Sequence, residues 1–215
     1  MVSPKFSKRK SMSRTTTDWL GVLTECGVRE VTAARWAPVF ARVITDASFD
    51  RGDTELGDFM GQILHESAKL ERVEEGLSYS ADRLMAVWPS RFPTITEANT
   101  YARNPEALAN KVYGGRLGNT SPGDGYRFRG RGLLQVTGRD NYRAVGRSMG
   151  VDLEAHPELL SDPDIALGAS IAWWEGNIPD SAVGDLVKIT KRVNGGTTGL
   201  AARTELTNEA REALA

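Results

Sequence analysis

The chain has 215 residues, of which 40% are hydrophobic and 26% are charged, and its formal net charge is −1. This composition is that of an ordinary globular protein, either one domain with a substantial core or two small lobes. A nearly neutral chain has no global attraction to nucleic acid or to an anionic surface. One cysteine excludes an internal disulfide framework, and the absence of an apolar run of about 18 residues argues against a membrane span.

The first residues form a polar segment rich in positive charge. Its basic residues are Lys5, Lys8, Arg9, Lys10 and Arg14. We expect residues 1–16 to be a disordered tail, with an arm that contacts nucleic acid or membrane as the alternative. The segment lacks the apolar core of a secretory signal, so the sequence predicts a protein made and folded in the cytosol.

Two short amphipathic helices are predicted next. Asp18 can cap a helix that carries Trp19 and ends at Gly27, with Cys26 as a small core residue. Thr32 can cap a second helix, whose buried face holds Trp36, Val39, Phe40, Val43 and Ile44.

The stretch from Asp58 to Glu75 holds the strongest candidates for catalysis. Apolar residues recur there at the spacing of one helix face: Leu56, Phe59, Met60, Ile63 and Leu64. At about 100° per residue, Glu66 falls on the margin of this face, where a partly desolvated carboxylic acid can keep a proton and donate it. The helical pattern fades after Leu70, so Glu74 and Glu75 are expected in the following connection, facing Glu66 across a groove.

The second half of the chain is also predicted to be helical. Helices are expected to begin at Ser80, Thr96, Asn104, Thr137 and Asp162, followed by one holding Leu186, Ile189 and Val193 and by a polar last helix that frays. Tyr126 and Phe128 alternate with arginines, which favours a short strand or hairpin. No βαβ alternation occurs, so the fold class is mainly α.

A metal site is excluded by the ligand count. A zinc-protease helix needs a second histidine four residues after the first. Lys69 stands at that position, and the other histidine, His156, lies in a turn that contains a proline. The same two histidines limit Ser–His–Asp and Cys–His sites. What remains is a carboxylate pair with amides, hydroxyls and tyrosines, which is the equipment of a glycosidase.

Several short motifs follow one another along the chain: His65-Glu66-Ser67, Glu75-Gly76-Leu77-Ser78-Tyr79-Ser80, Tyr113-Gly114, the run from Gly130 to Tyr142, and Val193-Asn194-Gly195-Gly196. Together they resemble glycoside hydrolase family 19, the chitinase-like family, and most closely its endolysins from bacteriophages. The resemblance runs from about residue 50 to 205. It implies a lysozyme-like fold of two mainly helical lobes that flank a substrate groove, with a minor β element.

The resemblance also assigns roles to individual residues. It implies that Glu66 is the general acid, Glu75 the general base, and Thr137 a residue that helps to hold the attacking water. Gln135, Asn141 and Asn194 match substrate-contacting positions of the family. Tyr79 and Tyr113 are further substrate-binding candidates, because their rings could stack on sugar faces. Lys69 departs from the family pattern and places a cation near the acid, and Glu74 beside Glu75 leaves the identity of the base open by one position.

The sequence therefore predicts a phage-type endolysin, an inverting glycosidase that cuts the β-1,4 glycan strands of bacterial peptidoglycan without a cofactor or metal. A chitinase and a non-catalytic wall-binding module are the alternatives. We expect a monomer in the host cytoplasm, with no nucleic acid partner and no stable membrane insertion, that needs a holin-like protein to reach the wall. Residues 17–215 are expected to form one catalytic domain, with a smaller lobe around 83–125.

Overall fold

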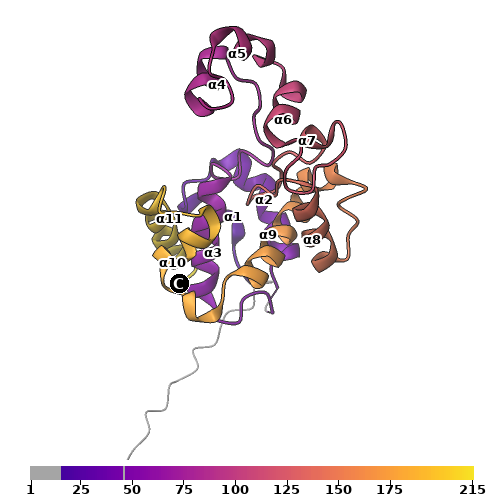
Figure 1. The fold of residues 1–215 in the computed structure, drawn as a ribbon. Helices are drawn as coiled ribbons and strands as arrows, with labels where there is room; N and C mark the ends of the chain where they lie inside the picture. The colour runs from indigo at the N-terminus through magenta and orange to yellow at the C-terminus, as the bar shows by residue number, and fades with distance from the viewer. Residues whose placement is uncertain (1–15, 46) are drawn as a thin grey trace, which may run out of the picture. The chain divides into compact units, whose positions relative to one another are not determined.

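The computed structural model describes residues 16–45 and 47–215, and helices dominate this part of the chain (Figure 1). They are α1 (Trp19–Glu25), α2 (Glu30–Val43), α3 (Asp53–Glu66), α4 (Ala81–Val87), α5 (Ile95–Tyr101), α6 (Pro105–Tyr113), α7 (Asp124–Arg127), α8 (Arg139–Met149), α9 (Pro163–Asn177), α10 (Leu186–Asn194) and α11 (Leu200–Ala213), with 3₁₀ turns at Pro157–Ser161 and Asp180–Ala182. The predicted mainly α class is confirmed. None of these helices, within the described residues, is long and apolar enough to cross a bilayer.

The chain divides into two compact units. The first comprises the residues up to Gln62 together with Ile178–Ala215. Its core is aromatic and aliphatic: Trp36, Phe40, Phe59, Leu56 and Met60 are fully buried. Helix α11 packs closely on α3, because a Cβ added at Gly61 would lie 2.0 Å from the hydroxyl oxygen of Thr207.

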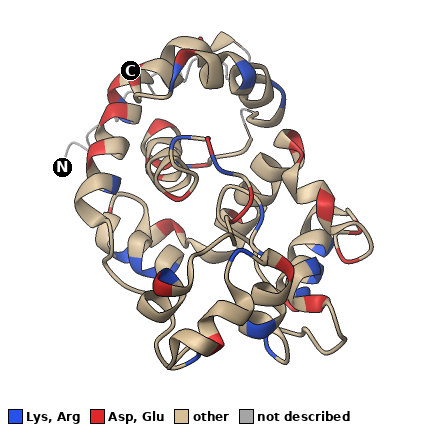
Figure 2. Ribbon diagram, turned by 90° about the horizontal axis from the view of Figure 1, so that it is seen from above, with Lys and Arg blue, Asp and Glu red and all other residues tan. Residues whose placement is uncertain are grey.

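Two polar contacts to buried side chains of α3 reinforce this packing. The guanidinium of Arg211 donates to Asp58 at 2.6 Å, and that of Arg203 donates to Gln62 at 2.8 Å. Burial raises the pKa of Asp58 even though Arg211 and the Gly184 amide favour its charged form. Lys and Arg are interspersed with Asp and Glu over the helices (Figure 2).

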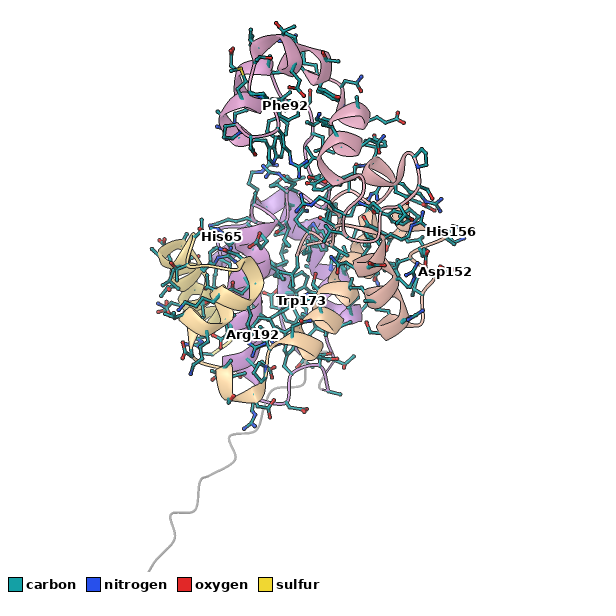
Figure 3. The ribbon with its side chains drawn as sticks, viewed as in Figure 1. His65, Phe92, Asp152, His156, Trp173 and Arg192 are labelled. Carbon is teal, nitrogen blue, oxygen red and sulfur yellow. The ribbon has the colours of Figure 1, made fainter. Side chains whose placement is uncertain are left out.

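The second unit, Ile63–Asn177, contains two hydrophobic clusters. One joins α4, α5 and α6 through Leu84, Phe92, Ala98, Leu108 and Val112. Phe92 lies at its centre (Figure 3), with Trp88 and Tyr101 in edge contact on either side. The other joins α8 and α9 through Phe128, Tyr142, Val145, Leu160 and Ala169.

Helix ends differ most from the sequence-based expectations. Helix α2 begins before Thr32, which is buried inside it, and the side chain that caps α5 is Thr94 rather than Thr96. Helix α8 begins after Gly138, and the Thr137 hydroxyl instead donates to the Gln135 carbonyl. These errors share one cause: threonine is a common N-cap, but the tertiary contacts decide where each helix begins.

The predicted strand or hairpin at residues 126–129 is wrong, because Asp124–Arg127 forms a helical turn. The minor β element lies next to it. Arg131 forms antiparallel bridges with both Glu74 and Val136. The last helix is polar as expected and is helical through Ala213.

The predicted tail, residues 1–16, lies outside the described residues except for Thr16. The smaller lobe around 83–125 stays a prediction.

Candidate active site

Glu66 is the last residue of α3 and is half-buried. The helix ends there because Ser67, fully buried, turns its side chain back on the backbone. Its hydroxyl donates to the Ile63 carbonyl at 2.6 Å and accepts from the Leu70 amide at 2.9 Å. Glu66 is therefore carried on a helix end that is fixed by a buried side chain.

A left-handed turn follows at once. Ala68, Lys69 and Leu70 have φ values of 51°, 56° and 66°. For residues other than glycine, this conformation costs roughly 1 kcal/mol or more each. The Arg72 amide closes the turn by donating to the Ser67 carbonyl at 2.9 Å. The turn reverses the chain, so the residues after it return toward Glu66.

The returning segment, residues 73–75, pairs with residues 130–132. The Glu75 amide donates to the Gly130 carbonyl at 2.9 Å, and the Gly132 amide donates to the Val73 carbonyl at 2.8 Å. This pairing fixes the backbone of Glu75 against a segment more than fifty residues away along the chain.

The carboxylate of Glu75 accepts hydrogen bonds from two neutral donors. The Gly130 amide donates to one oxygen at 2.5 Å, and the Tyr113 hydroxyl donates to the other at 2.8 Å. Burial and the neighbouring Glu75 charge raise the pKa of Tyr113 well above its usual range, so the phenol stays a donor. Each carboxylate oxygen keeps lone-pair capacity for a further partner such as water.

Glu74 has a different environment. Its carboxylate forms ion pairs with Arg129 and Arg131 and accepts from the Ser161 hydroxyl at 3.2 Å. Burial alone would raise the pKa of Glu74, but hydrogen bonds and charge from the two arginines hold it below its usual value. A carboxylate committed to two cations is a poor proton acceptor, so the geometry favours Glu75 over Glu74 as the base.

The same two arginines fix the segment that faces Glu75. Arg131 is buried and donates to the Arg127 carbonyl at 2.8 Å and to the Tyr142 hydroxyl at 3.0 Å. The Tyr142 hydroxyl donates in turn to the Arg129 carbonyl at 2.6 Å. Burial raises the pKa of Tyr142 to about 12.

Gly130 marks the point where the polar groups converge. A Cβ added there would lie 2.8 Å from Gln135 Oε1, 3.2 Å from Thr137 Oγ1 and 3.3 Å from the carboxyl carbon of Glu75. The amide of Gln135 is oriented by donating to the Gly132 carbonyl at 3.1 Å. A side chain at this position would press on all three groups, so glycine lets the predicted base and the predicted water-holding hydroxyl approach each other closely.

Glu66 and Glu75 line one cavity of about 380 Å³ with Arg72, Gly76, Tyr79 and Gln135. The lining thus includes both predicted catalytic carboxylates and two of the predicted substrate-binding residues. A helix end and a loop therefore present two carboxylates, an amide, a phenol and a guanidinium to one space.

The other predicted residues have local partners. Asn141 donates to the Thr137 carbonyl at 2.7 Å. Asn194 belongs to the first unit, where it closes the end of α10 by donating to the Thr198 carbonyl at 2.8 Å and accepting from the Gly196 amide at 3.2 Å. The Tyr113 hydroxyl is used to hold Glu75 rather than being free for a sugar. The roles of these side chains toward substrate stay predictions.

His65 lies on α3 and His156 precedes the 3₁₀ turn at Pro157–Ser161, with its side chain directed outward (Figure 3). The imidazole of His156 is 3.3 Å from Glu158. Among the described residues, no group of three His, Cys, Asp or Glu side chains is arranged to hold a metal ion.

Two residues of this site were not predicted from the sequence. The sequence does not predict Arg72 in the cavity, because a stretch without glycine gives no indication of three consecutive left-handed residues. Gly130 could have been found from the sequence because it begins the Gly130–Tyr142 motif. Its role becomes evident only from its closeness to Glu75, Gln135 and Thr137.

Comparison with known proteins gives one consistent result. A family model described as chitinase class I matches residues 30–192, more than half of the chain. A glycosyl hydrolase family 19 domain-containing protein from Haemophilus influenzae is 36% identical over 150 residues, which cover 69% of this chain and 74% of that protein. Endochitinase 2 of Gossypium hirsutum is 29% identical over 145 residues, 67% of this chain but 41% of that enzyme.

Among solved structures, chitinase C from Streptomyces griseus aligns with a TM-score of 0.57 and 18% identity. The alignment covers 99% of this chain and 83% of that chain. At this identity the likeness concerns the fold, and it confirms the predicted lysozyme-like helical architecture.

Proposed function

The chain belongs to glycoside hydrolase family 19 and is a glycoside hydrolase, and from this premise we propose that it is an endolysin that cuts the β-1,4 glycan strands of bacterial peptidoglycan. The observation that carries the proposal is that Glu66 and Glu75 line the same cavity. Peptidoglycan and chitin share the β-1,4 linkage between N-acetylated sugars, so one acid–base pair suits both. The motif resemblance to phage members of the family favours peptidoglycan.

In the proposed reaction, Glu66 gives its proton to the oxygen of the leaving sugar while Glu75 takes a proton from the attacking water. The bond from the anomeric carbon to the leaving oxygen breaks as the bond to the water oxygen forms on the opposite face. Thr137 and Gln135, which converge with Glu75 at Gly130, are the candidates for holding that water. Proton exchange with solvent then restores both carboxyl groups.

The electrostatics of the loop support this division of labour. Glu75 accepts from an amide and a phenol, which orient its oxygens without neutralising its charge. Its neighbour Glu74 is neutralised by Arg129 and Arg131. Arg129 and Arg131, which fix the loop, thus form their ion pairs with Glu74 rather than with Glu75.

The substrate is tested by digesting purified sacculi and colloidal chitin side by side and identifying the products by mass spectrometry. Soluble muropeptides with a new reducing end, and a much slower release of sugars from chitin, are expected. Efficient release from chitin alone would establish the chitinase alternative. Binding to sacculi without any product would establish a non-catalytic wall-binding module.

We further propose that the enzyme acts on the wall only after the membrane has been permeabilised by a separate, holin-like protein. Cells of a Gram-negative bacterium that express the chain alone are expected to stay intact until the membrane is breached. Lysis that follows induction with no added permeabilising agent would contradict this requirement.

A further inference from the structure

Arg72 is exposed and lines the cavity with Glu66 and Glu75, although it is neither of the two reacting groups. It reaches this place through the left-handed turn at Ala68–Leu70. Its backbone amide, bonded to the Ser67 carbonyl, ties it to the residue next to Glu66. The conformationally costly turn therefore places the guanidinium of Arg72 in the lining of the cavity that holds Glu66 and Glu75.

The guanidinium of Arg72 makes no hydrogen bond or ion pair with any residue in the ranges 16–45 and 47–215. Other arginines of the same unit are committed: Arg129 and Arg131 to Glu74, and Arg139 to Asp124. Arg72 thus keeps its full donor fork available to a ligand that enters the cavity.

A guanidinium fork is matched by a carboxylate, with which it forms paired, charge-assisted hydrogen bonds. Chitin is a neutral polymer and offers no such partner. A peptidoglycan strand carries an acidic peptide stem on every second sugar, so a carboxylate lies near each scissile linkage.

We propose that Arg72 binds a carboxylate of the peptide stem and thereby makes the cavity selective for peptidoglycan over neutral β-1,4 glycans. This inference rests on the proposed function, because it specifies which part of that substrate the site recognises. It assigns Arg72 to substrate binding rather than to the chemical step, so its contribution belongs in KM.

The alternative role for Arg72 is to offset the negative charge of Glu66 and Glu75. A charge-balancing cation affects every substrate equally and shifts the pH profile of kcat. A carboxylate-binding cation affects only substrates that carry carboxylates and leaves that profile in place.

The test uses soluble, uncross-linked peptidoglycan strands, either native or with their carboxyl groups converted to carboxamides. The wild-type chain is compared with Arg72→Gln, with Arg72→Lys, and with the control Arg83→Gln, which removes one positive charge from an exposed position of helix α4 outside the cavity. The wild-type enzyme is expected to show a KM roughly tenfold higher on the amidated strands. Arg72→Gln should show that raised KM on both substrates. Arg72→Lys should show an intermediate KM on native strands, and Arg83→Gln should behave as the wild type on both substrates.

An Arg72→Gln enzyme that still distinguishes the two substrates as the wild type does would overturn the inference. An equal loss on both substrates, with a shifted pH profile of kcat, would also overturn it and would assign Arg72 to charge balance. In either case the wild-type activity on native strands leaves the proposed function standing. A wild-type enzyme that cuts chitin but no peptidoglycan strand would overturn both.

Discussion

Glu66 and Glu75 line the same cavity but are supported in different ways. Glu66 is the last residue of a regular helix. The buried face of this helix, with Leu56, Phe59 and Ile63, follows from the helical spacing of its own apolar residues. Glu75 lies on a loop that is fixed by residues 113 and 130, far away in the chain. The predicted acid is thus placed by local structure and the predicted base by tertiary contacts. Changes distant from Glu75 are therefore expected to reach the base more easily than the acid.

The largest expected effect comes from the carboxylates themselves. Glu66→Gln removes the proton donor and is expected to lower kcat by about 10³-fold, within the usual range of general acid–base catalysis. Glu75→Gln should be nearly as damaging, and both variants should keep the wild-type melting temperature within a few degrees. Hydrolysis of soluble strands and thermal unfolding measure the two properties. Full activity in Glu75→Gln would move the base elsewhere, with Glu74 the first residue to examine.

Gly130→Ala tests whether the base depends on its distant partner. The added methyl would press on Gln135, Thr137 and Glu75, and a displacement of about 1 Å can cost about 100-fold in rate. We expect kcat to fall by that order, with a loss of about 1–3 kcal/mol in the free energy of unfolding. Gly176→Ala is the matched control, since its Cβ would meet nothing within 4 Å. Unchanged activity in Gly130→Ala would mean that catalysis does not depend on the close approach of Gln135, Thr137 and Glu75 at Gly130.

Tyr113→Phe removes one of the two donors to Glu75 and nothing else from the ring. Because a hydrogen bond to a charged group contributes roughly 1.5–3 kcal/mol, kcat should fall about tenfold or more, while KM changes little. If Tyr113 serves mainly to stack on a sugar, as the sequence predicted, the ring is retained and the activity of Tyr113→Phe should equal that of the wild type. A fall in kcat thus indicates that Tyr113 holds the base, whereas unchanged kcat and KM indicate a role in stacking.

Glu74→Gln is expected to have the smallest effect on activity, a few-fold, and a clearer effect on stability. Glu74 is partly exposed, so solvent screening reduces the loss to about 1–2 kcal/mol, or a few degrees in melting temperature. Since the folded protein holds the pKa of Glu74 below its usual value, this stabilisation is present at neutral pH. It is lost as the pH falls below about 4 and through the folded-state pKa. The difference in melting temperature between wild type and Glu74→Gln should therefore shrink between pH 7 and pH 3. A constant difference would contradict an ionic role.

The same contrast explains what the sequence could predict. Helix α3 and its acid follow from the spacing of Leu56, Phe59 and Ile63, which is a local pattern. Which of Glu74 and Glu75 is the base could not be predicted, because the two are adjacent in sequence. Only their contacts with Arg129, Arg131 and Tyr113 distinguish them. The roles of Gln135 and Thr137 came from the family resemblance, since their side chains alone fit many loops.

Arg72 is the clearest limit of prediction. Helical periodicity cannot predict where side chains point beyond Ser67, because the next three residues are left-handed. None of the three is glycine, so the sequence does not indicate this conformation. A side chain after such a turn can point in any direction until the tertiary structure is known. That Lys69 places a cation near the acid stays a prediction, whereas the cation that lines the cavity is Arg72.

The central claim is that Glu66 acts as acid and Glu75 as base on a water, rather than as a nucleophile on the sugar. It requires room for that water, which corresponds to carboxyl groups about 6.5–9.5 Å apart, and it inverts the anomeric configuration. Proton NMR of the first-formed product, recorded before mutarotation, tests this directly. The account predicts that the α-anomer appears first. Initial formation of the β-anomer would contradict it, because retention requires Glu75 to bond covalently to the sugar.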